Sequence, residues 1–434
     1  MRRRLTLFDV LCIGVNAIVG SGVFALPDDM QRVMGGWSPL AFLLCALLLM
    51  PVALCFAELG GRHDETGGAY IYAHRAFGRQ VGFIIGWFCW INTFISWAAN
   101  TTLFIELLGV TTFPANKLLV AGAVCALGAV NYFGVKPGSM LVNLVVIGKL
   151  TAILCFVAVG LGALDGRPLG GALPHGVLGV GQGIYLALFP LQGFEVAPVT
   201  AGETTNPRRN VPLGTIGSLL LSALLFVVVQ TVLVASYPML GRESDTPLVD
   251  GARYLGPILG GLVLIGSIVS IGGFTAGSAL GSPRYAEAIA TQGMLPAKLA
   301  AVHPRWHSPH VAVVVTTVLT AILGFFFDYR RLVGMSNVTV VIQYASTCVA
   351  VIFLRRADRA GAENGQTPRD PAAPKPWTIP GGPVVPVLGA LSSIALFAGA
   401  DLGEFIFAGA ALAVGVIVVL VSRPSATPAA RPPT

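Results

Sequence analysis

Long apolar runs recur along almost the entire chain of 434 residues, and this feature constrains the fold more than any other. A helix needs about 20 apolar residues to cross a hydrocarbon layer about 30 Å thick, where backbone groups must satisfy one another. The runs have this length and are bounded by turn-forming residues, so the sequence predicts an all-α integral membrane protein with about twelve spans. The predicted spans are 8–31, 39–61, 80–109, 116–135, 138–164, 178–203, 211–236, 253–290, 310–327, 331–355, 384–400 and 403–421.

Charged side chains are too few to cover a water-facing surface. They make up 11% of the chain, whereas a soluble domain carries about 25%. The net charge of +7 comes from Lys and Arg scattered through short loops, which argues against a nucleic-acid partner because such binding needs a continuous basic face. The seven cysteines lie in apolar runs without C-x-x-C spacing, so we expect them to pack between helices and to bind no metal. No nucleotide-binding loop or catalytic constellation stands out, so we expect neither a cofactor nor an enzyme.

Positive charges are distributed unequally between the two sets of alternating loops. Nineteen of the 27 Lys and Arg residues belong to the side that carries both termini, and seven belong to the other side. Cytoplasmic loops carry the excess of Lys and Arg. Both termini are therefore expected in the cytoplasm, and the multi-pass chain in the cell (inner or plasma) membrane.

The whole chain, residues 1–434, is predicted to be a single membrane transporter domain. Its first ten spans divide into two five-helix halves that we predict to be inverted repeats, and two helices follow. A polar, proline-rich stretch before the last two helices is predicted to be a flexible cytoplasmic linker. The boundaries are 5–164 for the first repeat, 178–355 for the second, 357–383 for the linker, 384–421 for the last two helices and 423–434 for a disordered tail.

The first span of each half is interrupted near its middle. The first span contains Gly20–Gly22, with the sequence Gly-Ser-Gly, and the sixth contains Pro190 and Gly193. Glycine and proline weaken a helix. Taken singly, the first interruption could equally be a packing face of small residues, and the second could equally be a simple helix kink. Their corresponding positions in the two halves favour a transporter site.

Unwound backbone inside a membrane needs a polar partner because lipid offers none. Freed N–H groups at the start of a half-helix favour an anion such as a carboxylate, and freed carbonyls at the end of one favour a cation such as an ammonium. A zwitterionic amino acid carries both groups. The two interruptions therefore predict a central site for an amino acid.

Two ionisable residues lie inside predicted spans, where an unpaired charge is unfavourable. Lys149 lies in the interior of span 138–164, and Glu195 follows the interruption of the sixth span. Both are candidates for coupling transport to a proton. The alternatives are that Lys149 extends to the membrane interface and that Glu195 is a hydrogen-bonded structural carboxyl.

Several separated motifs over roughly residues 5–355 resemble those of the amino acid–polyamine–organocation (APC) transporter superfamily. The resemblance depends on their order along the chain, since each motif alone is weak. It implies the LeuT-like fold, with two inverted five-helix repeats and two C-terminal helices. The motifs are Val19–Phe24 in the first span, Gly67–Gly78 in the loop after the second, Gly193–Glu195 in the sixth, Glu203–Pro212 after it, and Arg284 with Gly293–Pro296 near the end of the eighth.

The resemblance assigns roles to the residues of both interruptions. The backbone amides of Ser21 and Gly22 would bind the substrate carboxylate, and the carbonyls of Ile18 and of the sixth-span residues Phe189 and Gln192 would receive its amino group. The ring of Phe189 would also close over the substrate. The predicted substrate-binding residues are Ile18, Gly20, Ser21, Gly22, Asn92, Thr93, Phe189, Gln192, Gly193 and Phe274.

Lys149 resembles the fifth-helix lysine of many sodium-independent members. There the ammonium takes the place of a sodium ion and bridges the first helix to the eighth, where Ser278 has the matching position. We therefore predict sodium-independent transport, with Lys149, Glu195 and Ser278 as coupling residues. The loop 109–117 lacks the cysteine that joins some members to a heavy chain. No disulfide-linked partner is therefore expected, and a homodimer is left open.

The predicted function is secondary active transport of small or neutral L-amino acids by alternating access. Neutral substrates are favoured because the predicted pocket has no acidic side chain for a cationic one, and Trp97 replaces the polar residue of the arginine/agmatine exchangers. Exchange and proton symport are both compatible with the sequence. A polyamine or cationic amino acid antiporter is the alternative substrate class, and a membrane sensor on a transporter fold is the alternative from another class.

Overall fold

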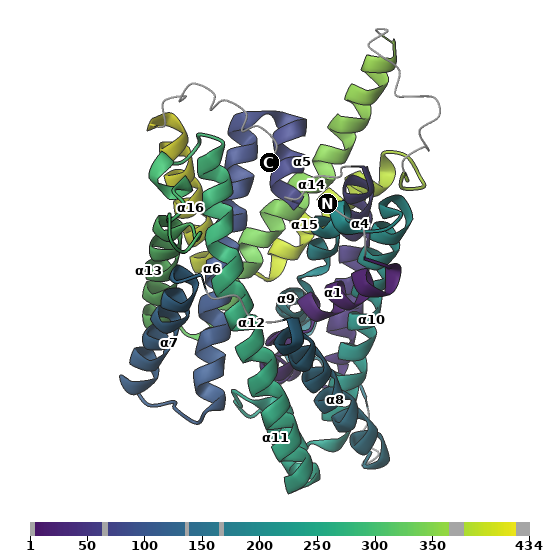
Figure 1. The fold of residues 1–434 in the computed structure, drawn as a ribbon. Coiled ribbons are helices and arrows are strands. Elements are labelled where there is room, and N and C mark those ends of the chain that lie inside the picture. Colours follow the sequence, from purple (N-terminus) through teal and green to yellow (C-terminus); the bar gives the residue numbers. More distant parts are fainter. Residues whose placement is uncertain (1–4, 63–67, 135–138, 165–168, 364–376, 422–434) are drawn as a thin grey trace.

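A computed structural model describes residues 5–62, 68–134, 139–164, 169–363 and 377–421 of the chain. These residues form α-helices, 3-10 helices and connecting loops, without a strand. Most of the long helices run side by side in one bundle (Figure 1). The helices are α1 (Leu7–Ile18), α2 (Gly22–Ala25), α3 (Pro27–Met34), α4 (Pro39–Arg62), α5 (Gly68–Phe77), α6 (Arg79–Leu107), α7 (Ala115–Tyr132), α8 (Ser139–Gly162), α9 (Gly176–Leu191), the 3-10 helix η2 (Phe194–Glu203), α10 (Pro207–Ser236), α11 (Pro247–Leu255), α12 (Pro257–Thr291), α13 (His310–Phe326), α14 (Tyr329–Glu363), α15 (Val384–Leu396) and α16 (Leu402–Val421).

The predicted order of membrane spans is present in the structure. Eight helices of the described residues are long and apolar enough to cross a membrane, namely α4, α6, α7, α9 with η2, α10, α12, α14 and α16. The shorter apolar helices α1, α13 and α15, together with the apolar part Ile147–Gly162 of α8, occupy the remaining places in the order. The predicted all-α membrane fold is thereby confirmed. The boundaries of the two repeats stay a prediction.

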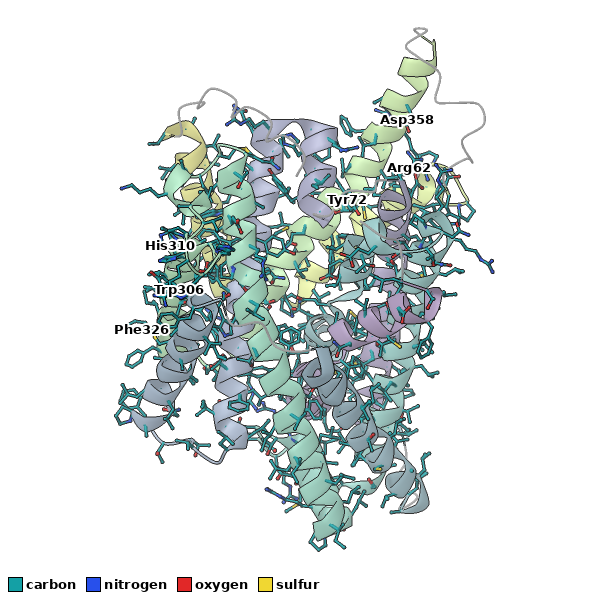
Figure 2. All side chains as sticks on the ribbon, viewed as in Figure 1. Arg62, Tyr72, Trp306, His310, Phe326 and Asp358 are labelled. Carbon is teal, nitrogen blue, oxygen red and sulfur yellow. The ribbon has the colours of Figure 1, made fainter. Side chains whose placement is uncertain are left out.

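The two ends of the bundle are distinguished by their elements. The α5 end holds α5 and the last turns of α14, and the α11 end holds α11 and the loop that precedes it (Figure 1). Arg62 also lies at the α5 end (Figure 2). The excess of Lys and Arg in the loops predicts that the α5 end faces the cytoplasm.

The eighth predicted span is two helices rather than one. Its first residues belong to α11, and the rest form α12. The helix breaks at Gly256, because the residue before a proline avoids the helical conformation and Gly256 precedes Pro257. Further along, Pro283 lies inside α12 without ending it. Proline has no N–H for the carbonyl of Ala279, and the side-chain amide of Asn131 on α7 donates to that carbonyl at 2.8 Å.

The motif after the second span is helical, contrary to the loop expected there. Residues Gly68–Phe77 form α5, which packs against α6 and α14. The helix is followed by Gly78, whose φ of 85° lies in the left-handed region that favours glycine at a helix end. Several residues of this short segment, among them Tyr70 and Tyr72, are buried.

The predicted flexible linker 357–383 also needs correction at both of its ends. Its first residues, up to Glu363, continue α14. Near its other end, the backbone N–H of Ile379 donates to Glu58 at 2.8 Å, and the carbonyl of Gly382 accepts from Arg355 at 2.6 Å. Residues 364–376 lie outside the described part of the chain. The composition of this stretch indicated a mobile segment, but side chains of α4 and α14 bond the backbone of Ile379 and Gly382.

Glu58 on α4 is the centre of an ionic cluster at the α5 end. Its fully buried carboxylate accepts hydrogen bonds from both Nε (2.8 Å) and Nη2 of Arg355 on α14. Arg62 pairs with the same carboxylate at 2.6 Å and with the exposed Asp358 at 3.0 Å. Figure 2 shows Arg62 and Asp358 next to each other at this end of the molecule. The cluster joins α4, α14 and the connection to α15.

Replacing Glu58 with alanine should destabilise the protein strongly, because two largely buried guanidinium groups lose their counter-charge. Breaking a buried ion pair from one side lowers the free energy of unfolding by about 3–5 kcal/mol. The melting temperature in detergent measures this effect. Asp358→Ala is the matched control, since its carboxylate is 68% exposed and an exposed pair contributes less than about 1 kcal/mol. Equal melting temperatures for Glu58→Ala and the wild type would contradict the assignment.

Candidate functional site

The first interruption lies where the sequence predicted it. Helix α1 ends at Ile18, and α2 begins at Gly22. Between them the N–H of Gly20 donates to the carbonyl of Ile18 at 2.8 Å, so it does not bond the carbonyl of Asn16 four residues earlier. Ser21 and Gly22 are the N-cap and first residue of α2, and the first N–H groups of a helix have no acceptor within it.

The ammonium of Lys149 bonds two carbonyls of this interruption. It donates to Asn16 at 2.8 Å and to Val19 at 2.7 Å, and the residue is only 3% exposed. This contact places a cation at the carboxyl end of a half-helix, where the helix dipole favours it. The alternative that Lys149 extends to the membrane interface is wrong. Both described bonds of the ammonium go to the first span, and Ser278 lies in a cavity wall instead.

The second interruption follows α9. The helix ends at Leu191, Gln192 is extended, and Gly193 has a φ of 117°. The chain then continues as η2, a 3-10 helix that contains Pro198, and not as the α-helix expected over the rest of this span. A long 3-10 segment is unusual, and it keeps the residues after the break close to α1.

The two interruptions pack directly against each other. A Cβ on Gly193 would lie 2.6 Å from the backbone carbonyl carbon of Ala17. A Cβ on Gly22 would lie 2.9 Å from Cα of Pro190. Both glycines are therefore required by close backbone approach, in addition to any role of their N–H groups.

A cavity of about 230 Å³ lies at this junction. Its wall also includes side chains of α6 and α12, and Gly68 and Ala69 of α5, so it extends toward the α5 end. The structure thus brings together every predicted site residue except Lys149, which bonds carbonyls of the first interruption from outside the cavity wall. The predicted residues in the wall are Ile18, Gly20, Ser21, Gly22, Asn92, Thr93, Phe189, Gln192, Gly193, Glu195, Phe274 and Ser278.

Glu195 has a structural contact as well as a place in the wall. One carboxylate oxygen accepts hydrogen bonds from the backbone N–H of Gly193 at 2.9 Å and from the hydroxyl of Tyr344 at 3.0 Å. The carboxylate therefore stabilises the turn of the second interruption. A role in proton coupling stays a prediction.

Helix α14 supplies polar partners that the sequence did not indicate. The side-chain oxygen of Asn92 accepts from Ser336 at 2.7 Å and Thr339 at 3.0 Å. The side-chain amide of Gln192 donates to Asn337 at 2.9 Å. The two predicted amide side chains are thus held in orientation by residues that appeared only as part of an apolar run.

The start of α14 closes the cavity at the α11 end. The hydroxyl of Tyr329 bonds the hydroxyl of Ser21 at 3.1 Å, and its ring meets Phe189 edge-on at 6.2 Å between centroids. The neighbouring Arg330 donates to both oxygens of the buried Asp29 on α3, at 3.0 and 2.9 Å. No sequence motif singled out these residues, because their partners lie about 300 residues away along the chain.

A helical membrane protein with a cavity between two interrupted spans has the architecture of a secondary transporter. The chain belongs to the amino acid permease family, whose profile matches residues 5–421. This match confirms the resemblance to the APC superfamily.

Similar proteins include permeases and transporters with different named substrates. The branched-chain amino acid permease BcaP of Bacillus subtilis (strain 168) is 26% identical over 418 residues, which cover 90% of this chain and 86% of the relative. The methylthioribose transporter of the same organism is 24% identical, with 90% and 87% covered. The cationic amino acid transporter 4 of Mus musculus is 28% identical over 82% of this chain, and the match spans only 60% of the mouse protein.

Proposed function

We propose that this chain is a secondary active, sodium-independent transporter of small or neutral L-amino acids, which works by alternating access across the plasma membrane. The observation that carries the proposal is the cavity at the junction of the two interruptions. The N–H groups of Ser21 and Gly22 at the start of α2 would receive the carboxylate, and the carbonyls of Ile18, Phe189 and Gln192 would receive the ammonium.

The expectation that the pocket has no acidic side chain is wrong, because Glu195 lies in the cavity wall, and what favours a neutral substrate is that this carboxylate already accepts two hydrogen bonds. Among the described residues that line the cavity, Glu195 is the one charged side chain. Its carboxylate is already engaged by Gly193 and Tyr344. The alternative is a cationic amino acid, which this carboxylate and the name of the mouse relative would favour.

The position of Lys149 supports sodium independence. Its ammonium occupies carbonyls of the first interruption that a bound cation would otherwise use. A second cation at the same carbonyls would meet a like charge at close range, which opposes binding. The closed α11 end, held by Tyr329 and Arg330, supports alternating access, since the cavity extends toward the α5 end.

Uptake of labelled amino acids into proteoliposomes tests the proposal. We expect neutral amino acids to be taken up equally well when sodium is replaced by choline at fixed ionic strength. Uptake that requires preloaded vesicles would establish exchange, and uptake into empty vesicles driven by an inward proton gradient would establish symport. Strong dependence on sodium, or uptake confined to arginine, lysine or polyamines, would contradict the proposal.

A further inference from the structure

Pro283 removes a backbone hydrogen-bond donor from the part of α12 that lines the cavity. Ser278, Gly281 and Ser282 of this part belong to the cavity wall. The ring nitrogen of proline carries no hydrogen, so the carbonyl of Ala279, four residues earlier, loses its usual partner in the helix. Ala279 is only 2% exposed. A buried carbonyl without a partner is unfavourable, so this carbonyl needs another donor.

Asn131 on α7 is that donor. Its side-chain nitrogen lies 2.8 Å from the carbonyl oxygen of Ala279, and the residue is 6% exposed. The reverse orientation of the amide would place two oxygens against each other, so the nitrogen faces the carbonyl. Among the described residues, the other side chains that bond carbonyls of α12 belong to α12 itself. Their acceptors are Val263, Ile271, Leu280 and Glu287.

The bond from Asn131 lies behind the cavity wall. Ala279 packs in a buried cluster with Trp97 of α6 and Val124 of α7, and none of these three residues lines the cavity. Ser278, the neighbour of Ala279 in the chain, does line it. Asn131 is also absent from the wall. It therefore acts on α12 from behind the wall, out of contact with the substrate.

Helix α7 offers a firm support for this bond. It packs closely against α13, since a Cβ on Gly128 would lie 2.4 Å from the hydroxyl oxygen of Thr317. At the end of α7, the buried hydroxyl of Ser308 donates to the carbonyl of Tyr132 at 2.6 Å. Asn131 lies between these two contacts in the chain. Its side chain is thus presented to α12 by a helix that is held in place on both sides of it.

We propose that Asn131 is a positioning residue for transport: it fixes α12 at the turn from Ser278 to Ser282 and thereby sets the substrate affinity of the cavity. Without this donor, α12 would have to rotate or unwind locally to bring the carbonyl of Ala279 to water in the cavity. Either movement displaces Ser278 and its neighbours in the wall. This inference rests on the proposed function and adds to it a residue outside the cavity.

The concentration of substrate that gives half-maximal uptake into proteoliposomes tests the role of Asn131. Asn131→Leu keeps the approximate size of the side chain but removes the donor. The half-saturation concentration is expected to rise about tenfold, which corresponds to about 1.4 kcal/mol, because a buried carbonyl loses its partner and the wall is displaced. The maximal rate should change less, since no group that binds or closes over the substrate is removed.

A second substitution shows whether the effect depends on Pro283. Pro283→Ala restores the backbone N–H at this position, which can bond the carbonyl of Ala279 as in a regular helix. The two substitutions should therefore be non-additive, as expected for residues whose roles meet at one carbonyl. In the Pro283→Ala background, Asn131→Leu should change the half-saturation concentration by less than about twofold.

Ser308→Ala is the matched control. The hydroxyl of Ser308 is also buried and also donates to a backbone carbonyl, but that carbonyl belongs to Tyr132 of α7 and not to α12. The half-saturation concentration of Ser308→Ala should equal that of the wild type, even if its melting temperature in detergent falls. A purely structural role for Asn131 would give the same pattern in Asn131→Leu and would contradict the inference.

The comparison of the two backgrounds can also overturn the inference. An equal rise in half-saturation concentration in the wild-type and Pro283→Ala backgrounds would show that Asn131 does not act through the carbonyl of Ala279. If Asn131→Leu alone does not fold, the double variant decides: near-wild-type half-saturation supports the inference, and failure to fold rejects it. Absence of uptake of any amino acid by the wild type would instead reject the proposed function, and this inference with it.

Discussion

Proteoliposomes that contain Lys149→Ala are expected to transport amino acids at least about tenfold more slowly than the wild type, with membrane insertion unaffected. The ammonium satisfies two carbonyls that the interruption of the first span frees. A hydrogen bond from a charged donor contributes about 1.5–3 kcal/mol, and about 1.4 kcal/mol corresponds to a factor of ten. Without these bonds the interruption loses the support that holds its N–H groups toward the cavity.

Two further variants separate the role of the charge from that of the side-chain length. Lys149→Met keeps the length without the ammonium and should be as defective as the alanine variant. Lys117→Ala is the matched control, because Lys117 also donates to a backbone carbonyl, that of Phe327 at 2.6 Å, but lies near the α11 end outside the cavity wall. Its transport should be close to that of the wild type. Wild-type uptake rates in Lys149→Ala would reject the role assigned to Lys149.

Among Gly→Ala substitutions in the two interruptions, Gly193→Ala is expected to impair folding and transport most. A Cβ there would lie within 2.6–2.8 Å of backbone atoms of Ala17 and Ile18, which cannot move aside as a flexible side chain would. The φ of 117° adds backbone strain of about 1–3 kcal/mol for a residue other than glycine. We expect loss of monodisperse protein on size exclusion, or transport at background level if the protein still folds.

A glycine of the same span serves as its control. Gly181 lies in α9, and a Cβ there would meet nothing within 4 Å. Gly181→Ala should therefore keep normal transport and a normal elution profile, helped slightly by the better helix propensity of alanine. If Gly193→Ala behaved in the same way, the close packing of the two interruptions would be wrong.

The candidate site could be predicted to a large extent because its backbone chemistry leaves a local signal. Glycine and proline mark an interrupted helix wherever they occur together, and a lysine inside an apolar run indicates a buried partner. The predicted site residues other than Lys149 accordingly line one cavity. The bridge from Lys149 to Ser278 was not found among the described contacts, since a spacing along one helix does not specify which neighbour a long side chain will reach.

Other parts of the site have no local signal. Tyr329 lies at the start of an apolar run and Ser336 lies inside it. Nothing in the sequence around them indicates that Tyr329 bonds Ser21 or that Ser336 bonds Asn92. Similarly, the sequence offers Glu58 only Arg62, four residues later on the same helix, and its pairing with Arg355, 297 residues away, becomes evident only in the folded chain. The predicted flexible linker was wrong near residues 379–382 for the same reason, because the side chains that bond their backbone lie on α4 and α14.

The sequence by itself determined that this chain is a helical membrane protein, where its spans lie and which two of them are interrupted. These properties depend on the length of apolar runs and on the conformations open to glycine and proline, which are local. Only the tertiary structure decided that the interruptions touch, which side chains close the cavity and which residue of another helix bonds the carbonyl that Pro283 leaves free. These depend on contacts between helices far apart in the chain, whose geometry is set by packing and is not encoded in any single segment.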